Sequence, residues 1–224
     1  MFELCAAAAF FAGIHLLVSG TSLRDTLVAR LGEKPYTGLF SLASALGLAA
    51  LIYSYSANRV PQVTSLLAWR GAAALILLLA IALIVFGVSS RGPTAVGGGS
   101  LLDRDDPARG IHRITRHPML WGIVLWAATH LLFNPQPVNL VFFGAFLLTA
   151  AAGTVSIDAK RRRKFGERWL RYERLTSNLP FLAISQGRNR LAMSEISLVQ
   201  LAIALAIFTG LVLFHGRWFG LPPF

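Results

Sequence analysis

The chain has little of what disulfide-rich proteins and soluble enzymes need. It contains a single cysteine, Cys5, so no internal disulfide can form, and this residue is expected to be inert packing. Zinc-finger and HExxH spacings, a glycine-rich phosphate loop and a GxSxG elbow are all missing. Charged residues make up only 14% of the 224 positions. These absences give no support to a soluble hydrolase, kinase or dehydrogenase.

Long apolar runs dominate instead. Hydrophobic residues make up 55% of the chain and the mean hydropathy is +0.60. Six runs are each close to the ~20 residues that a helix needs to cross a bilayer; they cover residues 2–20, 38–56, 71–88, 117–134, 138–157 and 196–214. The first run has no basic n-region and carries Glu3, so we expect a retained helix rather than a signal peptide. We predict an all-α, polytopic membrane bundle of about six transmembrane helices, forming one domain over 1–224.

The positive charge follows membrane topology. The formal net charge is +11, but the Lys and Arg residues lie in short segments between the apolar runs, which argues against a nucleic-acid partner. Segments 21–37, 89–116 and 158–195 carry 3, 5 and 10 of them, leaving three of 21 elsewhere. Because basic loops favour the cytoplasmic side, we expect these segments in the cytoplasm and the N-terminus outside.

The segment after the fifth run is both basic and aromatic. Phe165, Trp169 and Tyr172 recur at three- and four-residue spacing among Arg and Lys residues. This pattern predicts an interfacial amphipathic helix over about 160–175, with its aromatic side turned inward and its cations facing membrane lipids. A plain positive-inside loop is the alternative.

Histidines supply the candidate chemistry. His15 and His130 lie inside apolar runs, where an ionisable residue is costly and commonly functional, although a hydrogen bond to a neighbouring helix would also explain either one. His117, in an Arg116-His117-Pro118 helix start, lies about 19 Å and about 220° from His130 on one helix, so these two cannot bind one metal. The remaining possibilities are a metal or haem held by histidines of different helices, or an enzyme using the cytoplasmic ends of the fourth and fifth runs.

Three motifs, "LGEKPYTGLFSLASALG", "NRVP" and "RHPMLWGIVLWAATHLLFN", resemble the NnrU family of bacterial inner-membrane proteins over about residues 1–180. The family is linked to denitrification through nitrite and nitric oxide reductase, and it is related to ζ-carotene isomerase, a haem b membrane protein that isomerises a cis double bond of a carotenoid.

The resemblance implies a multi-pass protein of the bacterial inner membrane. It assigns His15 and His130 as ligands of haem b and matches His117 to a histidine important in the isomerase; we expect Arg116 and His117 to organise the cytoplasmic mouth of a site for a lipophilic substrate. An accessory role beside a membrane oxidoreductase is the other function it implies. Ala127 stands where the isomerase has an exchangeable cysteine, and Pro135 where the family usually has glycine. The predicted topology also places His15 and His130 at depths that differ by roughly 10 Å.

The same region is similar to the isoprenylcysteine carboxyl and phospholipid methyltransferases. That similarity would place S-adenosylmethionine beside Arg116, His117, Asp158, Trp169 and Tyr172. Asp158 stands where those enzymes have a pair of glutamates, and Trp169 stands where they have a tyrosine. A common cavity for His15 and His130 would favour the haem protein, whereas convergence of His117 and Asp158 on a cytoplasmic pocket would favour the methyltransferase.

Overall fold

The computed structural model describes residues 1–59, 69–95 and 97–220, and the regular structure within these ranges is entirely helical. The all-α prediction is therefore confirmed. Val60 and Pro61 of the Asn-Arg-Val-Pro motif lie outside the described residues. The chain divides into two compact units, Met1–Leu67 with Ala127–Gly153 and Ala68–Trp126 with Thr154–Phe224. The single membrane domain over 1–224 stays a prediction.

Each predicted apolar run contains a helix. In chain order these are α1 (Phe2–Gly13) with the π-helical turn η1 (Ile14–Val18), α3 (Glu33–Ala57), α4 (Arg70–Ser89), α5 (Pro118–Phe133), α6 (Pro137–Phe165) and α9 (Leu198–Phe219). Within the described ranges, α3, α4, α6 and α9 are long and apolar enough to cross a membrane. A fifth span results if Phe2–Val18 and α2 (Leu23–Leu31), which are bent by 80°, count as one. With 16 residues, α5 is shorter than its predicted run.

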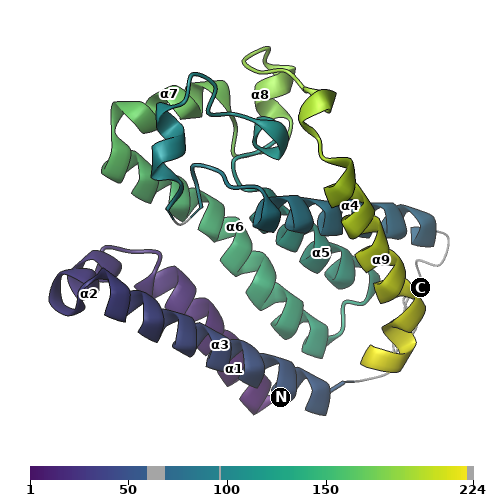
Figure 1. The fold of residues 1–224 in the computed structure, drawn as a ribbon. Coiled ribbons are helices and arrows are strands. Elements are labelled where there is room, and N and C mark those ends of the chain that lie inside the picture. The colour runs from purple at the N-terminus through teal and green to yellow at the C-terminus, as the bar shows by residue number, and fades with distance from the viewer. Residues whose placement is uncertain (60–68, 96, 221–224) are drawn as a thin grey trace. The chain divides into compact units, whose positions relative to one another are not determined.

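In the first unit, α1 packs against α3 (Figure 1). Leu4 of α1 and Leu51 of α3 are fully buried. Gly47 permits the close approach, because a Cβ at this position would lie only 2.9 Å from the Phe10 ring. The Tyr55 hydroxyl donates a 2.8 Å hydrogen bond to Asn139 Oδ1, which ties the end of α3 to the start of α6.

In the second unit, α4 packs against α9 (Figure 1) and also closely against α5. A Cβ at Gly122 of α5 would lie 2.6 Å from the Ala80 carbonyl oxygen, so glycine is required for this helix contact. A segment with two short 3-10 helices, η3 (Gly98–Asp103) and η4 (Gly110–Arg113), connects α4 to α5. The aromatic and aliphatic side chains of Phe86, Leu83 and Ile111 form a core between α4 and η4.

A polar clamp holds the start of α9. Arg113 donates hydrogen bonds of 2.8 Å to both carboxylate oxygens of Glu195, and Glu195 also accepts from the Gly110 backbone at 2.6 Å. Asp106 pairs with the same guanidinium at 2.5 Å. Glu195 belongs to η5 (Met193–Glu195), directly before α9. The hydrogen bond from Arg113 lowers the pKa of Glu195 to about 2.

The basic segment after the fifth run is folded differently from the predicted continuous helix. Helix α6 continues to Phe165 and ends at Gly166, whose φ is +51°. Helix α7 (Glu167–Leu175) follows directly. Trp169 and Tyr172 of α7 are fully buried against Leu102 and Ala108. Their rings are therefore covered by the chain of the η3 region and not by lipid. A short helix α8 (Leu182–Ser185) leads from there toward η5.

Candidate functional site

The Arg116-His117-Pro118 sequence begins α5, as its pattern predicts, and hydrogen bonds fix its backbone. Pro118 is the first helical residue, where its missing N–H costs nothing. The Arg116 N–H donates to the Ser177 carbonyl at 3.0 Å, and the Arg116 carbonyl accepts from the Thr94 hydroxyl at 2.9 Å. The turn is thus held from two sides within the second unit.

Both side chains of this turn meet the carboxylate of Asp158. Arg116 donates from Nη2 at 2.5 Å and from Nε at 3.2 Å, and His117 Nε2 lies 2.7 Å from Asp158 Oδ1. Because a carboxylate oxygen only accepts, His117 Nε2 is the donor and Nδ1 keeps the lone pair when the ring is neutral. The exposed fractions of the Arg116, His117 and Asp158 side chains are 6%, 1% and 11%. This is a buried, charge-assisted network.

Two further residues extend the network. Arg116 Nη1 donates to the Thr176 hydroxyl at 3.4 Å, and Glu173 lies 3.7 Å from Arg116 Nη2. Glu173 in turn pairs with the half-exposed Arg162 at 2.6 Å. The formal charges of the two guanidinium groups are therefore balanced by two carboxylates, which is the condition under which buried charges are tolerated.

Beside this network, α7 carries two buried polar atoms without partners. Trp169 Nε1 and the Tyr172 hydroxyl have no hydrogen-bond partner among the described residues, although both side chains are fully buried. Burial raises the pKa of Tyr172 above its ordinary range. Unsatisfied buried groups are rare in folded proteins and require an explanation, such as a bound molecule or a tolerated cost.

His112, to which the sequence assigned no role, is also buried close to this turn. Its Nε2 lies 3.4 Å from the Ser90 carbonyl, and its ring packs directly against Gly92. Burial lowers the pKa of His112. The ring is therefore neutral at physiological pH, and it packs inside the segment that connects α4 to α5.

His15 lies in the first unit, in the π-helical turn η1. Its Nδ1 lies 2.7 Å from the Phe11 carbonyl oxygen. Because a carbonyl only accepts, Nδ1 carries the proton and Nε2 carries the lone pair of the neutral ring. This is the arrangement that metal-ligating histidines adopt, and π-helical turns occur frequently at functional sites.

A row of rings in stacked, tilted and edge-to-face contacts, here called the aromatic row, connects His15 to His130 within the same unit. Its members in order are His15, Phe11, Phe146, Phe142, Phe143 and His130. Successive ring centroids lie 4.6, 5.3, 5.2, 5.0 and 4.5 Å apart. Phenylalanine rings therefore occupy the path between the two histidines.

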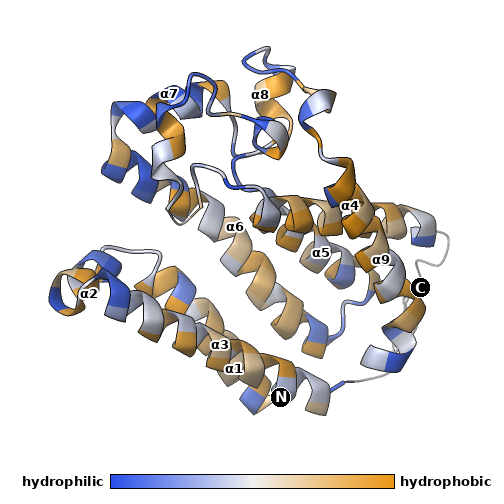
Figure 2. Ribbon diagram, viewed as in Figure 1, coloured by the Kyte–Doolittle hydropathy of each residue, from blue (hydrophilic) through white to orange (hydrophobic). Residues whose placement is uncertain are grey.

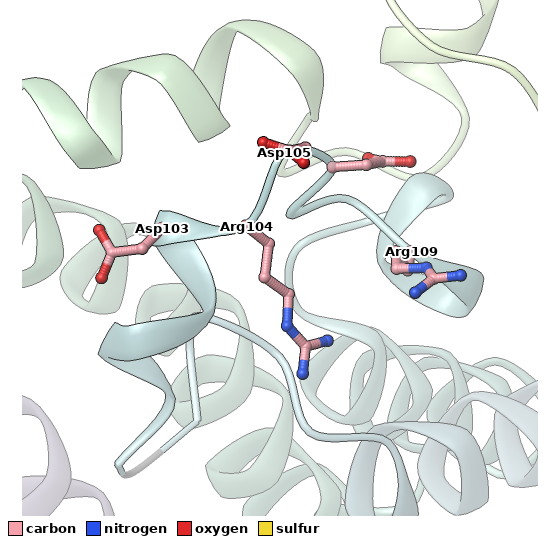
Figure 3. Close-up of a pocket in the computed structure, with 5 residues that line it drawn as sticks. Asp103, Arg104, Asp105 and Arg109 are labelled. Carbon is pink, nitrogen blue, oxygen red and sulfur yellow. The ribbon is translucent and has the colours of Figure 1, made fainter.

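Among the described residues, two surface hollows lie close together near Asp103, and neither is lined by a predicted site residue. One of about 410 Å³ is lined by Asp103, Arg104, Asp105, Asp106 and Arg109. Figure 3 shows its labelled side chains pointing in different directions instead of converging on one point. The other, of about 320 Å³, is lined by Leu102, Asp103, Glu167, Arg168 and Arg171. Neither hollow is therefore lined by a residue of the Arg116–His117–Asp158 network or of the path between His15 and His130.

A family model described as "NnrU protein" matches residues 3–223. The chain belongs to the NnrU family. The resemblance drawn from the three sequence motifs is thereby confirmed, and it extends over nearly the whole chain.

Two curated relatives of this NnrU-family chain have the same name, "15-cis-zeta-carotene isomerase, chloroplastic". The one from Zea mays is 33% identical over 82 residues, which cover 37% of this chain and 22% of the relative. The one from Arabidopsis thaliana is 32% identical over 79 residues, which cover 35% of this chain and 22% of the relative. The match thus spans about a fifth of the length of these relatives. No solved structure matches the chain.

The predicted site residues of this NnrU-family protein fall into two groups. Arg116 and His117 meet on Asp158, a partner that the sequence suggested only through the methyltransferase similarity. His15 and His130 share the first unit and are connected by the aromatic row. The contacts of Glu173 and Thr176 with Arg116 were not predicted, because no spacing in the sequence links these residues to position 116.

Within the described ranges, no group of three or more His, Cys, Asp or Glu side chains is arranged to hold a metal ion. This result therefore does not bear on a site formed by only two histidines.

Proposed function

We propose that this NnrU-family protein is an isomerase-like membrane protein that acts on a lipophilic, conjugated substrate, with haem b held by His15 and His130. The observation that carries the proposal is the aromatic row between these two histidines, in a unit that contains the membrane-length helix α3 and the first part of α6. The names of the curated relatives, which specify isomerisation of a cis carotenoid, point to the same substrate class.

The donor chemistry of His15 fits an iron ligand. The hydrogen bond from Nδ1 to the Phe11 carbonyl sets the tautomer and orients the ring, so that Nε2 presents its lone pair. The same bond makes the imidazole a better electron donor. When bound, haem would supply the electron exchange that lowers the bond order of a polyene double bond.

His130 fits the second position less directly. Its ring stacks on Phe143 with an interplanar angle of 20°, and the row continues through Phe142 and Phe146 before it reaches Phe11. Both imidazoles can bind one iron only if these phenylalanine rings separate. The proposal therefore includes a rearrangement of the row when haem enters.

The aromatic side chains have a second role in the proposed reaction. A conjugated hydrocarbon offers no hydrogen-bonding groups, so its site must be formed by apolar and aromatic surface. Phe142 stacks on Tyr55 of α3 at 4.1 Å, and the Tyr55 hydroxyl is satisfied by Asn139. These residues would exclude water and provide aromatic surface against which the polyene could pack.

Conversion of a cis polyene tests this function. The purified protein, supplied with haem in detergent, is incubated anaerobically with 15-cis-ζ-carotene, and the isomers are separated by chromatography. We expect loss of the cis isomer with the wild type and at least about tenfold slower loss with His15→Ala or His130→Ala, since each removes a proposed ligand. His215→Ala in α9 is the matched control and should retain activity. An unchanged isomer ratio with the haem-loaded wild type would contradict the proposal.

A second candidate function is methyl transfer from S-adenosylmethionine. It is favoured by one observation, the convergence of Arg116 and His117 on Asp158. Against it, these groups satisfy one another, and neither identified hollow is lined by them. Calorimetric titration of S-adenosylmethionine into the detergent-purified protein distinguishes the candidates. Micromolar binding that is lost in Asp158→Asn would support methyl transfer, whereas absence of binding to the wild type would exclude this function.

We also propose that the protein is a multi-pass protein of the bacterial inner membrane, with the basic segment after α6 in the cytoplasm. In a Cys5→Ala background, Arg190→Cys should react with a membrane-impermeant maleimide only after lysis, whereas Arg59→Cys should react in intact spheroplasts. The reverse pattern would contradict this orientation. An accessory role beside a membrane oxidoreductase is the function that would remain if neither haem nor S-adenosylmethionine bound.

A further inference from the structure

The turn between α7 and α8 exposes apolar side chains. Within residues 179–182, here called the apolar turn, the exposed fractions of Leu179, Phe181 and Leu182 are 52%, 48% and 37%, and Pro180 lies between the first two. Turns normally carry polar residues and glycine, so four consecutive apolar residues at an exposed turn are unusual. A contiguous apolar surface of this kind marks an interaction site.

Phe181 holds the apolar turn in a conformation that glycine adopts more easily. Its φ is +64°, and no other non-glycine residue of the described ranges has a positive φ. A side chain in this left-handed region is strained, because its Cβ approaches a carbonyl oxygen of the backbone. The sequence nevertheless places a large ring here, and the ring stays about half exposed instead of filling the core. Such an outlier points to a role for the side chain outside the packing of the fold.

Hydrogen bonds within the second unit fix the backbone of the apolar turn. The Phe181 N–H donates to the Ile114 carbonyl at 2.9 Å. The Ser177 hydroxyl donates to the Leu179 carbonyl at 2.8 Å and accepts from the Ala183 N–H at 2.9 Å. These polar groups are satisfied by the protein itself and do not need water, which is a condition for contact with hydrocarbon.

The length of α6 locates the edge of the membrane. Residues 137–157 are uncharged and span about 31 Å at 1.5 Å per residue, close to the ~30 Å thickness of the hydrocarbon core. Asp158 is the first charged residue beyond them and therefore marks the edge of this core. Figure 2 shows the change along α6, from the orange of its apolar part to the blue of its end.

Short bonds connect this edge to the apolar turn. Arg116 pairs with Asp158, and the Arg116 N–H donates to the Ser177 carbonyl at 3.0 Å. The Thr115 hydroxyl donates to the Asn178 carbonyl at 2.5 Å. Residues 177 and 178 therefore lie close to the level of Asp158, and the apolar turn, which follows them directly, lies at the boundary between headgroups and hydrocarbon.

We propose that the apolar turn inserts into the membrane between the headgroups and the acyl chains, with lipid as its partner. Leu179, Phe181 and Leu182 contact the acyl chains, and the left-handed backbone at Phe181 sets the direction of its ring. Part of the connection between α7 and α9 thus dips into the bilayer, instead of lying wholly in the cytoplasm. The inference rests on the membrane placement proposed above and not on the isomerase-like activity.

Collision rates of a nitroxide spin label test the proposal. In a Cys5→Ala background, the full-length variants Phe181→Cys, Leu148→Cys and Arg190→Cys are labelled and reconstituted in vesicles of phosphatidylcholine and phosphatidylglycerol. Molecular oxygen concentrates in hydrocarbon, whereas a polar nickel chelate, present on both sides, is excluded from it. Leu148, 63% exposed in the apolar part of α6, is the control for lipid, and the exposed Arg190 is the control for water. Leu179→Cys is a second reporter that leaves Phe181 in place.

We expect the ratio of oxygen to nickel collision rates at positions 179 and 181 to exceed that at Arg190 by at least about fivefold, because the chelate is excluded from hydrocarbon. A ratio as low as that at Arg190 would place the turn in water and overturn the proposal. Low collision rates with both reagents would show that protein covers the turn and would also overturn it. A low ratio at Leu148 would contradict the membrane placement itself, so the two failures are distinguishable.

Discussion

Asp158→Asn removes the negative charge on which the buried network of the second unit depends. The substitution leaves the Arg116 guanidinium, whose side chain is only 6% exposed, without its bidentate partner, and it weakens the hydrogen bond from His117. Breaking a buried ion pair by removing one partner costs about 3–5 kcal/mol. Because Glu173 lies 3.7 Å from the same guanidinium and still offsets part of its charge, we expect the lower end, about 3 kcal/mol.

The free energy of unfolding is measured by titrating the purified protein from a mild detergent into dodecyl sulfate and following tryptophan fluorescence. Asp103→Asn is the matched control, because Asp103 pairs with Arg168 where both side chains are about half exposed, and such pairs contribute less than about 1 kcal/mol. The double variant Arg116→Gln/Asp158→Asn should recover part of the loss, since no uncompensated charge remains buried. A loss for Asp158→Asn no larger than that for Asp103→Asn would refute this interpretation of the network.

Three further predictions concern buried groups of the second unit. Tyr172→Phe should leave the free energy of unfolding unchanged or raise it by about 1 kcal/mol, because the hydroxyl is buried without a partner; a loss above about 1 kcal/mol in the same titration would show that it has one. Gly92→Ala should lower the midpoint of thermal unfolding by several degrees, because the new methyl group would overlap the His112 imidazole, and an unchanged midpoint would contradict the packing described. The pKa of Glu195 is lowered from its usual 4.5 to about 2, so its stabilising effect should be complete above pH 4.5 and disappear as the pH falls toward 2. Glu195→Gln should flatten the pH dependence of unfolding in that window, and an unaltered pH profile would exclude this role.

Much of the fold could be predicted from the sequence, because membrane-length apolar runs are a strong and local signal. All six predicted runs contain helices, and the Arg116-His117-Pro118 turn begins α5 where the proline pattern places it. The basic 160–175 segment shows the limit of such patterns. Trp169 and Tyr172 do lie on one short helix, α7, whereas Phe165 ends α6 before the break at Gly166. The spacing also does not reveal whether lipid or protein covers these rings, and here Leu102 and Ala108 cover Trp169 and Tyr172.

The candidate sites were harder to predict, because their contacts join residues that are distant in the chain. Asp158 is 42 positions from Arg116 and is identified as its partner only by the fold or by similarity to another family. The aromatic row could not be anticipated from single positions, since Phe11 belongs to α1 and Phe146 to α6. The hydrogen bond that orients His15 depends on the π-helical turn η1, which no residue pattern in the sequence indicated.

The absorption spectrum of the detergent-purified protein tests the proposed haem site most directly. The wild type, expressed with a haem precursor, should show a Soret band, and this band should be reduced or shifted in His15→Ala and in His130→Ala. His215→Ala, which removes a histidine from α9, should leave it unchanged. A wild type without a Soret band, or a band that is the same in all four proteins, would contradict haem ligation by His15 and His130.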